Sequence, residues 1–313
     1  MRVARCVLVA CMLVACVLIG LSGSARADSV SIRDLEAVNE TGNGTHESLG
    51  WPNVSDPDHD TLAESKVVVE GILLNQSADY LNPASTFQVY VQGDDGGGVA
   101  VYAAKWYGYS TDDWAAEYAR MSKNPATGHV FQAGDRVRVT GLTMFYRGKT
   151  NINERHESDT DYDVTLELIA AGEGMPDVTE LPSISQCKVF DQTRATGGEL
   201  YQGTWCQLQN VWIASGTWGA GNTIQVTDNG TDLFPVLLSA MGDFNSYSAP
   251  AGKFNVTGIF DQEDTASPYT EYRFWVKDYG DFGAASSVPE PAGCAILAIG
   301  LAGAILGTRR RRA

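Results

Sequence analysis

Alternating apolar and polar positions run through the middle of the chain and predict β-strands over most of its length. In the first half this pattern predicts strands at residues 67–74, 87–91, 99–102, 134–141, 142–146 and 150–153. In the second half it predicts them at residues 205–213, 223–226, 234–238, 251–260 and 272–276. One helix is expected to begin at Ser110, because Trp114, Tyr118 and Met121 then share one face. The pattern therefore indicates an all-β body with one short helix.

The two halves of this body resemble each other. Ala133–Leu142 aligns with Ala251–Ile259, and Gln88-Val89 aligns with Gln225-Val226. The offsets of 118 and 137 residues differ by about the length of residues 106–125, which we interpret as an insertion in the first half. A repeat of this kind predicts two copies of one structural unit.

The order of strands and the motif Gly-Asp-x-Val-x-Val-x-Gly, read from Gly134 to Gly141, resemble the OB-fold-like modules that occur in tandem in secreted bacterial proteins. The resemblance implies two consecutive five-stranded barrels, which close most of their sheet edges. A β-sandwich of the same strands is the competing architecture.

The N-terminus has the pattern of a secretory signal. Arg2 and Arg5 precede an apolar run over residues 6–21, and Ala25 and Ala27 are small residues at the two positions that a signal peptidase reads. An uncleaved anchor is the first alternative, although the run is shorter than the roughly 20 residues that a bilayer needs. Lipidation of Cys16 is the second alternative, although the apolar run continues past that residue.

The C-terminus combines a tripeptide, an apolar segment and an arginine cluster. Pro289, Glu290 and Pro291 precede an apolar stretch over residues 292–307, and Arg309, Arg310, Arg311 and Arg312 follow it. In this order the three parts resemble the PEP-CTERM sorting signal. The resemblance implies that an exosortase-type peptidase processes the tail and that the host makes exopolysaccharide. Before processing, the apolar helix would hold the protein in the membrane with its arginines on the cytoplasmic side; a plain anchor is the alternative.

These patterns divide the chain into five regions. They are a signal peptide (1–27), a polar N-terminal segment (28–64), a first OB-like module (65–178), a second OB-like module (179–283) and a sorting tail (284–313). The expected location is the inner membrane through the tail, and then the cell surface or the extracellular space.

The charge of the body disfavours nucleic acid as a partner. The chain has 22 basic and 38 acidic residues; without the seven arginines and one glutamate of the two ends, the body keeps 15 and 37, a net charge of -22. Because binding to nucleic acids depends mainly on neutralising phosphates, its usual surface is basic. Divalent cations or neutral sugars are the partners that such a body favours.

Two cysteines remain in the body once both ends are removed. Cys187 and Cys206 form an even pair in an exported protein, which predicts a disulfide bond between them.

No catalytic motif is recognisable, so we expect no enzyme and no cofactor. The four histidines are not at metal-binding spacing, and no nucleophile elbow, P-loop or dinucleotide fingerprint is present. Asp56, Asp58 and Asp60 alternate, as do Asp159, Asp161 and Asp163; calcium is a hypothesis for these clusters, with solvated turns as the alternative.

Aromatic residues crowd the insertion and are the candidate ligand-binding residues. Trp106, Tyr107, Tyr109 and Trp114 lie close together in the sequence, and exposed aromatic rings stack on sugars. We therefore expect a surface or matrix protein that engages exopolysaccharide. The alternatives are a nucleic-acid-binding module and a glycan hydrolase with a carboxylate pair that the sequence does not reveal.

Overall fold

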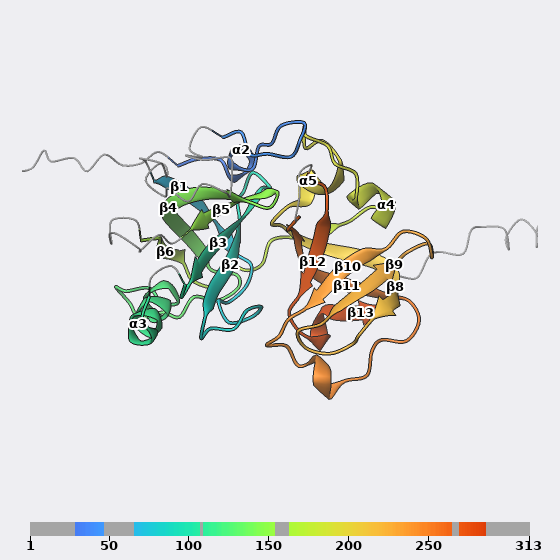
Figure 1. The fold of residues 1–313 in the computed structure, drawn as a ribbon. Coiled ribbons are helices and arrows are strands. Elements are labelled where there is room, and N and C mark those ends of the chain that lie inside the picture. The colour runs from blue at the N-terminus through green and yellow to red at the C-terminus, as the bar shows by residue number, and fades with distance from the viewer. Residues whose placement is uncertain (1–28, 47–65, 107–108, 154–162, 265–268, 286–313) are drawn as a thin grey trace, which may run out of the picture.

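The computed structural model describes residues 29–46, 66–106, 109–153, 163–264 and 269–285 (Figure 1). In these ranges the chain forms two β-barrels that follow one another along the sequence, with few and short helices. The predicted signal peptide and sorting tail lie outside the described residues.

The first barrel has five strands in the spatial order β1-β2-β3-β5-β4 and closes where β4 pairs with β1. β3 and β5 run parallel, and the other neighbours run antiparallel. A further strand, β6, pairs with the part of β4 that precedes its pairing with β5. The bounds are β1 Val67–Leu73, β2 Thr86–Gln92, β3 Gly98–Ala104, β4 Arg136–Tyr146, β5 Lys149–Asn153 and β6 Thr165–Ala170.

The second barrel repeats this topology in the order β8-β9-β10-β12-β11, and it closes where β11 pairs with β8. β10 and β12 run parallel, as β3 and β5 do in the first barrel. Two short strands, β7 and β13, extend the sheet along β8 and β11. The bounds are β7 Thr179–Glu180, β8 Trp205–Gly216, β9 Thr223–Thr227, β10 Phe234–Leu238, β11 Phe254–Gln262, β12 Tyr272–Val276 and β13 Phe282–Ala284.

The expected fold class is therefore confirmed: the body consists of two consecutive closed five-stranded barrels, and the sandwich alternative is wrong. The topology is consistent with tandem OB-like modules. Closure leaves few sheet edges open to pair with another chain.

The internal repeat is confirmed, with a correction to its register. Gly134 and Gly252 both have positive φ and precede β4 and β11. Within the strands, however, Val139 pairs with Val69 and Val256 pairs with Leu208. The strands thus align at an offset of 117 rather than 118 residues, and the pairing of β4 is irregular at Arg136 and Val137.

The matched glutamines also need a correction. Gln88 and Gln225 do lie on the corresponding strands β2 and β9. Val89 pairs with Val101, whereas its counterpart Ile224 pairs with Val236. Gln88 comes one residue before Val89, whereas Gln225 comes one residue after Ile224. The two glutamines are therefore two positions away from being equivalent.

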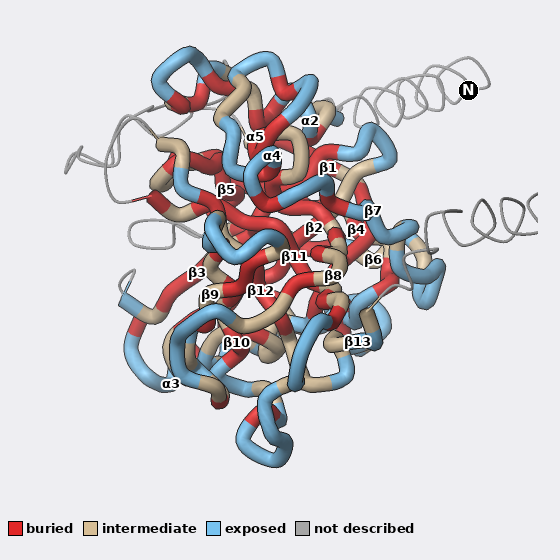
Figure 2. The backbone as a smooth tube through the Cα atoms, turned by 90° about the vertical axis from the view of Figure 1, so that its right-hand side faces the viewer, coloured by how far each residue is buried: buried red, intermediate tan, exposed pale blue. Residues whose placement is uncertain are grey.

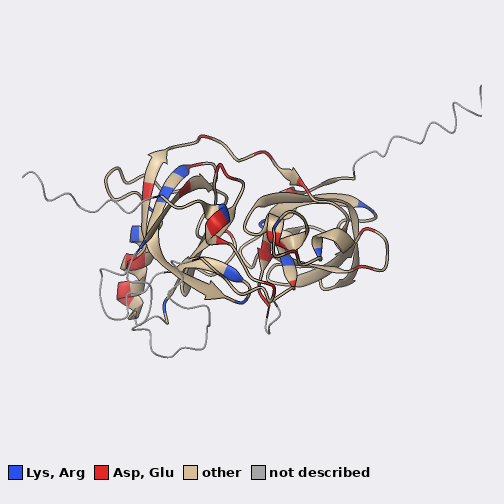
Figure 3. Ribbon diagram, turned by 90° about the horizontal axis from the view of Figure 1, so that it is seen from above, with Lys and Arg blue, Asp and Glu red and all other residues tan. Residues whose placement is uncertain are grey.

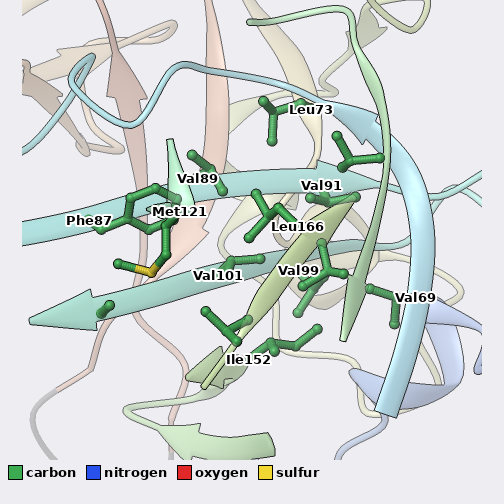
Figure 4. Close-up of a cluster of buried hydrophobic side chains, with 14 of the residues drawn as sticks. Val69, Leu73, Phe87, Val89, Val91, Val99, Val101, Met121, Ile152 and Leu166 are labelled. Carbon is green, nitrogen blue, oxygen red and sulfur yellow. The ribbon is translucent and has the colours of Figure 1, made fainter. Parts of the chain in front are cut away.

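The interior of the first barrel is filled by alternate residues of its strands. Phe87, Val89 and Val91 of β2 point inward with Val99 and Val101 of β3 (Figure 4). Helix α3 (Thr111–Met121) begins after its N-cap Ser110, as predicted, and adds Trp114 and Met121 to this core. The inserted helix is thus part of the hydrophobic core of the first barrel.

The polar N-terminal segment also contributes to the first barrel. The short helix α2 (Ile32–Leu35) buries Ile32 and Leu35 in the same core. The carboxylate of Glu36, which follows α2, is fully buried and accepts a hydrogen bond from the backbone N–H of Thr150 at 3.2 Å. Burial raises the pKa of Glu36 to about 8.

The interior of the second barrel has its own hydrophobic cluster. It includes Phe234, Phe260 and Phe274, and Phe244 of the 3-10 helix η4 (Phe244–Ser246) lies between β10 and β11, where the first barrel has α3. Figure 2 shows buried residues along the strands of the molecule and exposed residues mainly in the loops. The remaining short elements are α4 Ile184–Cys187, α5 Gly197–Tyr201 and η5 Tyr279–Asp281.

The two barrels pack against each other through a third hydrophobic cluster. Tyr90 and Ala100, on the outer side of β2 and β3, meet Ile259 and Trp275 of β11 and β12. Beside this cluster the backbone approaches itself closely, because a Cβ atom on Gly98 would lie 2.1 Å from the carbonyl oxygen of Gly203. The barrel junction is therefore a packed interface.

Candidate functional site

A pocket of about 450 Å³ lies at the junction of the two barrels. One wall is the outer side of the first barrel, with residues from β2, β3, β4 and β5. The other wall comes from β12 and from Glu263, directly after β11. Its volume is in the range of about 300–1,000 Å³ that is typical of small-molecule pockets.

The strand pattern explains why polar side chains face this pocket. Ile152 of β5 points into the core of the first barrel, and successive residues of a strand point to opposite sides. Its neighbours Asn151 and Asn153 therefore lie on the outer side, where they line the pocket with Gln88 of β2. Sequence alternation that builds the barrel core thus also builds a polar outer wall.

Two amides of this wall have acceptor atoms without partners. The side chains of Asn151 and Asn153 are 4% and 0% exposed. Among the described residues, neither Oδ1 atom has a hydrogen-bond partner. Buried polar atoms in folded proteins are nearly always paired, so these two enclosed oxygens are exceptions in this wall.

The opposite wall carries a buried ionic network that joins the barrels. Asp261 at the end of β11 lies 2.7 Å from Lys149 Nζ of β5 and 2.8 Å from Arg273 Nε of β12. It also accepts a hydrogen bond from the indole N–H of Trp275 at 3.0 Å. Burial alone would raise the pKa of Asp261, but the charges of Lys149 and Arg273 outweigh it and hold the pKa below its usual range.

Glu263 extends the network to the pocket rim. It pairs with Arg147 at 3.0 Å and also with Arg273. In Figure 3, basic and acidic positions lie on both sides of the barrel junction. The two lining cations, Lys149 and Arg273, are therefore balanced by the carboxylates of Asp261 and Glu263.

Aromatic rings complete the lining. Trp106 is 63% exposed and lies against Tyr102 of β3, with 6.4 Å between the ring centroids. Trp275 lies across the pocket, and the guanidinium of Arg273 is 5.1 Å from the centroid of its ring. An exposed indole beside buried amides offers one apolar face and several hydrogen-bonding groups to the same ligand.

The structure separates the predicted aromatic residues by burial, and ligand binding by Trp106 stays a prediction. Trp106 is exposed and lines the pocket, whereas Tyr107 lies outside the described residues. Trp114 is only 2% exposed and Tyr109 8%, because both pack into the core of the first barrel. Trp114 also donates its indole N–H to the carbonyl of Pro83 at 2.9 Å, so it is a core residue rather than a ligand platform.

The predicted disulfide is not formed in the structure. Cys187 of α4 and Cys206 of β8 are free thiols, both buried in the hydrophobic cluster of the second barrel. The Cys206 thiol lies 3.2 Å from the Thr204 hydroxyl. Burial raises the pKa of each thiol to about 12, which makes both unreactive at neutral pH.

Most of the predicted acidic clusters lie outside the described residues, including Asp56, Asp58, Asp60, Asp159 and Asp161. The backbone carbonyl of Asp163, which is described, accepts a hydrogen bond from Lys66 Nζ at 2.9 Å. In the described ranges, no group of three or more His, Cys, Asp or Glu side chains is placed to hold a metal ion. Calcium binding by these clusters stays a prediction.

Sequence reasoning missed most of the pocket. It left Lys149 between the strands predicted at 142–146 and 150–153, and it gave no role to Asn151, Asn153, Arg273 or Trp275. The available signal was the alternation of polar residues along 149–153, which is unusual for a strand that is buried on both sides. This signal does not identify the residues that face β5 across the pocket, because they belong to the second barrel.

A scan against models of protein families and a search of curated proteins both gave no match to this chain. In the described part of the chain, no helix has the length and apolar character needed to cross a membrane.

Proposed function

We propose that this protein is an exported, non-enzymatic binding protein of the cell surface or extracellular matrix that holds part of an exopolysaccharide in the pocket between its barrels. The observation that carries the proposal is the lining of that pocket. It brings the exposed ring of Trp106 together with the amides of Asn151 and Asn153 in a space sized for a small ligand. Sugars present both apolar faces and hydroxyl groups, and this lining can contact both.

The lining supports binding over catalysis. Glu263 is the one carboxylate among the described residues that line the pocket, and Arg147 and Arg273 both pair with it. Glycoside hydrolysis ordinarily requires two carboxyl groups on either side of the bond that breaks.

The two ends of the sequence support the proposed export and location. The signal pattern up to Ala27 and the tail from Val288 favour export, followed by processing by an exosortase-type peptidase. The acidic body disfavours nucleic acid as the ligand.

Protein isolated from native cells tests both parts of the proposal. Its intact mass is expected to lack both ends, and it should be retarded by the native exopolysaccharide in affinity electrophoresis. Trp106→Ala should weaken this binding roughly tenfold, since stacking on one ring contributes about 1–3 kcal/mol.

Tyr247→Ala is the matched control, because Tyr247 is an exposed aromatic residue outside the pocket lining. Its retardation should equal that of the wild type. Unchanged retardation of Trp106→Ala would remove the pocket from the proposal, and a salt-dependent shift with DNA in place of glycan would favour the nucleic-acid alternative.

A further inference from the structure

The N-terminal segment crosses from one barrel to the other. We call residues 29–46 the N-terminal strap; in Figure 1 this blue segment runs along the top of the molecule. On the first barrel, the backbone N–H of Val30 donates to the carbonyl of Val68 in β1 at 2.8 Å. On the second barrel, the backbone N–H of Tyr269, shortly before β12, donates to the carbonyl of Thr41 at 3.3 Å. The strap therefore spans the junction.

Both barrels also hold the strap around α2. On the first barrel, Asp95 in the turn between β2 and β3 accepts hydrogen bonds from the Ser31 hydroxyl at 2.7 Å and from the backbone N–H of Arg33 at 2.9 Å. On the second barrel, Arg33 Nη2 donates to the carbonyl of Arg194 at 3.1 Å, and the guanidinium of Arg194 donates to the carbonyl of Arg33. Detaching the strap would therefore remove contacts to each barrel.

Glu36 is buried beneath the strap without a paired cation. It is 1% exposed, and it accepts a hydrogen bond from the backbone N–H of Thr150 at 3.2 Å. In the described part of the chain no ion pair joins it to a basic residue. Of the nearby cations, Lys149 is held by Asp261 at 2.7 Å, and Arg194 donates to backbone carbonyls. Since burying an unpaired carboxylate is costly, the docked strap favours uncharged Glu36.

The third ionisable group that faces Glu36 is Glu199 of α5, which is also buried. Glu199 is 0% exposed, and its Oε1 accepts a hydrogen bond from the Tyr272 hydroxyl at 2.8 Å. Its Oε2 has no partner among the described residues. A negative charge on Glu199 would also repel one on Glu36. Two buried carboxyl groups at one place therefore both favour the uncharged form.

From this arrangement we propose that the N-terminal strap is a pH-dependent clamp, docked on both barrels while Glu36 is uncharged and detached from them when Glu36 ionises. The clamp controls how firmly the two barrels are held together. This proposal goes beyond the proposed function, since it does not depend on the ligand.

The direction of the pH dependence follows from the burial of Glu36. Burial raises its pKa from 4.5 to about 8, although the charges of Arg194 and Lys149 act to lower it. In a detached strap the carboxyl group is exposed to water and returns to its ordinary pKa. The docked strap thus keeps a proton that the detached strap loses, so docking is strongest below about pH 4.5 and weakens as pH rises through 8. Between pH 5 and 8 the equilibrium constant for detachment should rise roughly hundredfold.

The test is hydrogen exchange of the protein from native cells, followed by mass spectrometry at pH 5 and at pH 8. The result is expressed as protection factors, which remove the intrinsic pH dependence of exchange. Protection of peptides from the strap should fall roughly hundredfold. At pH 8 these peptides should be at least roughly tenfold less protected than peptides from β2 and β9, because local detachment leaves the barrels folded.

Two variants of the strap separate Glu36 from other carboxyl groups. Glu36→Gln keeps the size and an acceptor oxygen of the side chain but cannot ionise, so strap protection should change by less than roughly tenfold between pH 5 and 8. Asp34→Asn is the matched control, because Asp34 is an exposed carboxylate on the same helix. It should keep the fall in protection that the wild type shows.

Each contrary outcome is decisive. Equal strap protection at pH 5 and pH 8, or an unchanged fall in Glu36→Gln, would overturn the proposal. So would strap peptides that are as protected at pH 8 as those of β2 and β9, because the strap would then open only when the whole protein unfolds. Glycan binding enters none of these measurements, so the proposed function stands or fails separately.

Discussion

The two barrels share one topology but present different chemistry on their corresponding strands. β5 and β12 occupy the same place in each barrel, and pairing to β4 and β11 matches Asn151 with Arg273 and Asn153 with Trp275. The first barrel thus offers amides where the second offers a cation and an indole. The inward positions Ile152 and Phe274 remain apolar in both. The comparison shows that the repeat conserves its core and that the outward residues, which the core does not constrain, produce the pocket.

The ends of the barrels differ as well. Between the third and fourth strands, the first barrel has an eleven-residue helix, α3, where the second has the three-residue η4. Both insert an aromatic ring into the core, Trp114 in one case and Phe244 in the other. The longer insertion therefore has the same structural role as the shorter one.

Trp114→Ala should break this equivalence most strongly. Removing a buried tryptophan leaves a cavity and is expected to lower the free energy of unfolding by about 3–5 kcal/mol, measured by urea denaturation. Trp106→Ala, eight residues earlier and exposed, is the control and should change it by less than about 0.5 kcal/mol. Equal losses in the two variants would contradict the division into core and pocket residues.

Asp261→Asn should show how far the barrels depend on each other. The substitution leaves Lys149 and Arg273 close together without their shared carboxylate, and it should cost about 3 kcal/mol of stability. Because Met144 occupies the corresponding position of β4, Met144→Leu is the matched control and should cost less than about 1.5 kcal/mol. A neutral effect of Asp261→Asn would mean that the network does not hold the junction.

The pH dependence of stability tests two buried carboxyl groups, those of Glu36 and Glu199. Burial raises the pKa of Glu36 to about 8, and burial raises that of Glu199, which accepts a hydrogen bond from the Tyr272 hydroxyl at 2.8 Å, to about 7. Since the folded state then holds protons that the unfolded state has lost, stability is full below about pH 4.5 and falls as pH rises. Between pH 5 and 7 each group contributes about 2 kcal/mol, so the free energy of unfolding should fall by about 4 kcal/mol in all.

Glu36→Gln removes one of the two groups and should make this decline shallower, measured by urea denaturation at each pH. If the stability of the wild type rises from pH 5 to pH 7, the two carboxyl groups are not protonated in the folded state.

The pattern of the sequence predicted the secondary structure well, because alternation follows directly from which side of a strand is buried. The strands, the start of the helix at Ser110 and the repeat were all visible in it. The exact register of the repeat was not visible in the sequence. The equivalence of Val139 and Val256 follows only from their pairing with neighbouring strands. The disulfide expected from the count of cysteines was also wrong, because the two residues are free thiols in the core.

The sequence by itself therefore determined the two barrels, the candidate export and sorting segments, and the acidic body, because each depends on local composition or periodicity. Only the tertiary structure decided which aromatic residues are available to a ligand, since Trp106 and Trp114 differ in burial and not in residue type. It also decided the pocket, because Asn151 and Arg273 are more than 100 residues apart and meet only where the outer faces of the two barrels pack together.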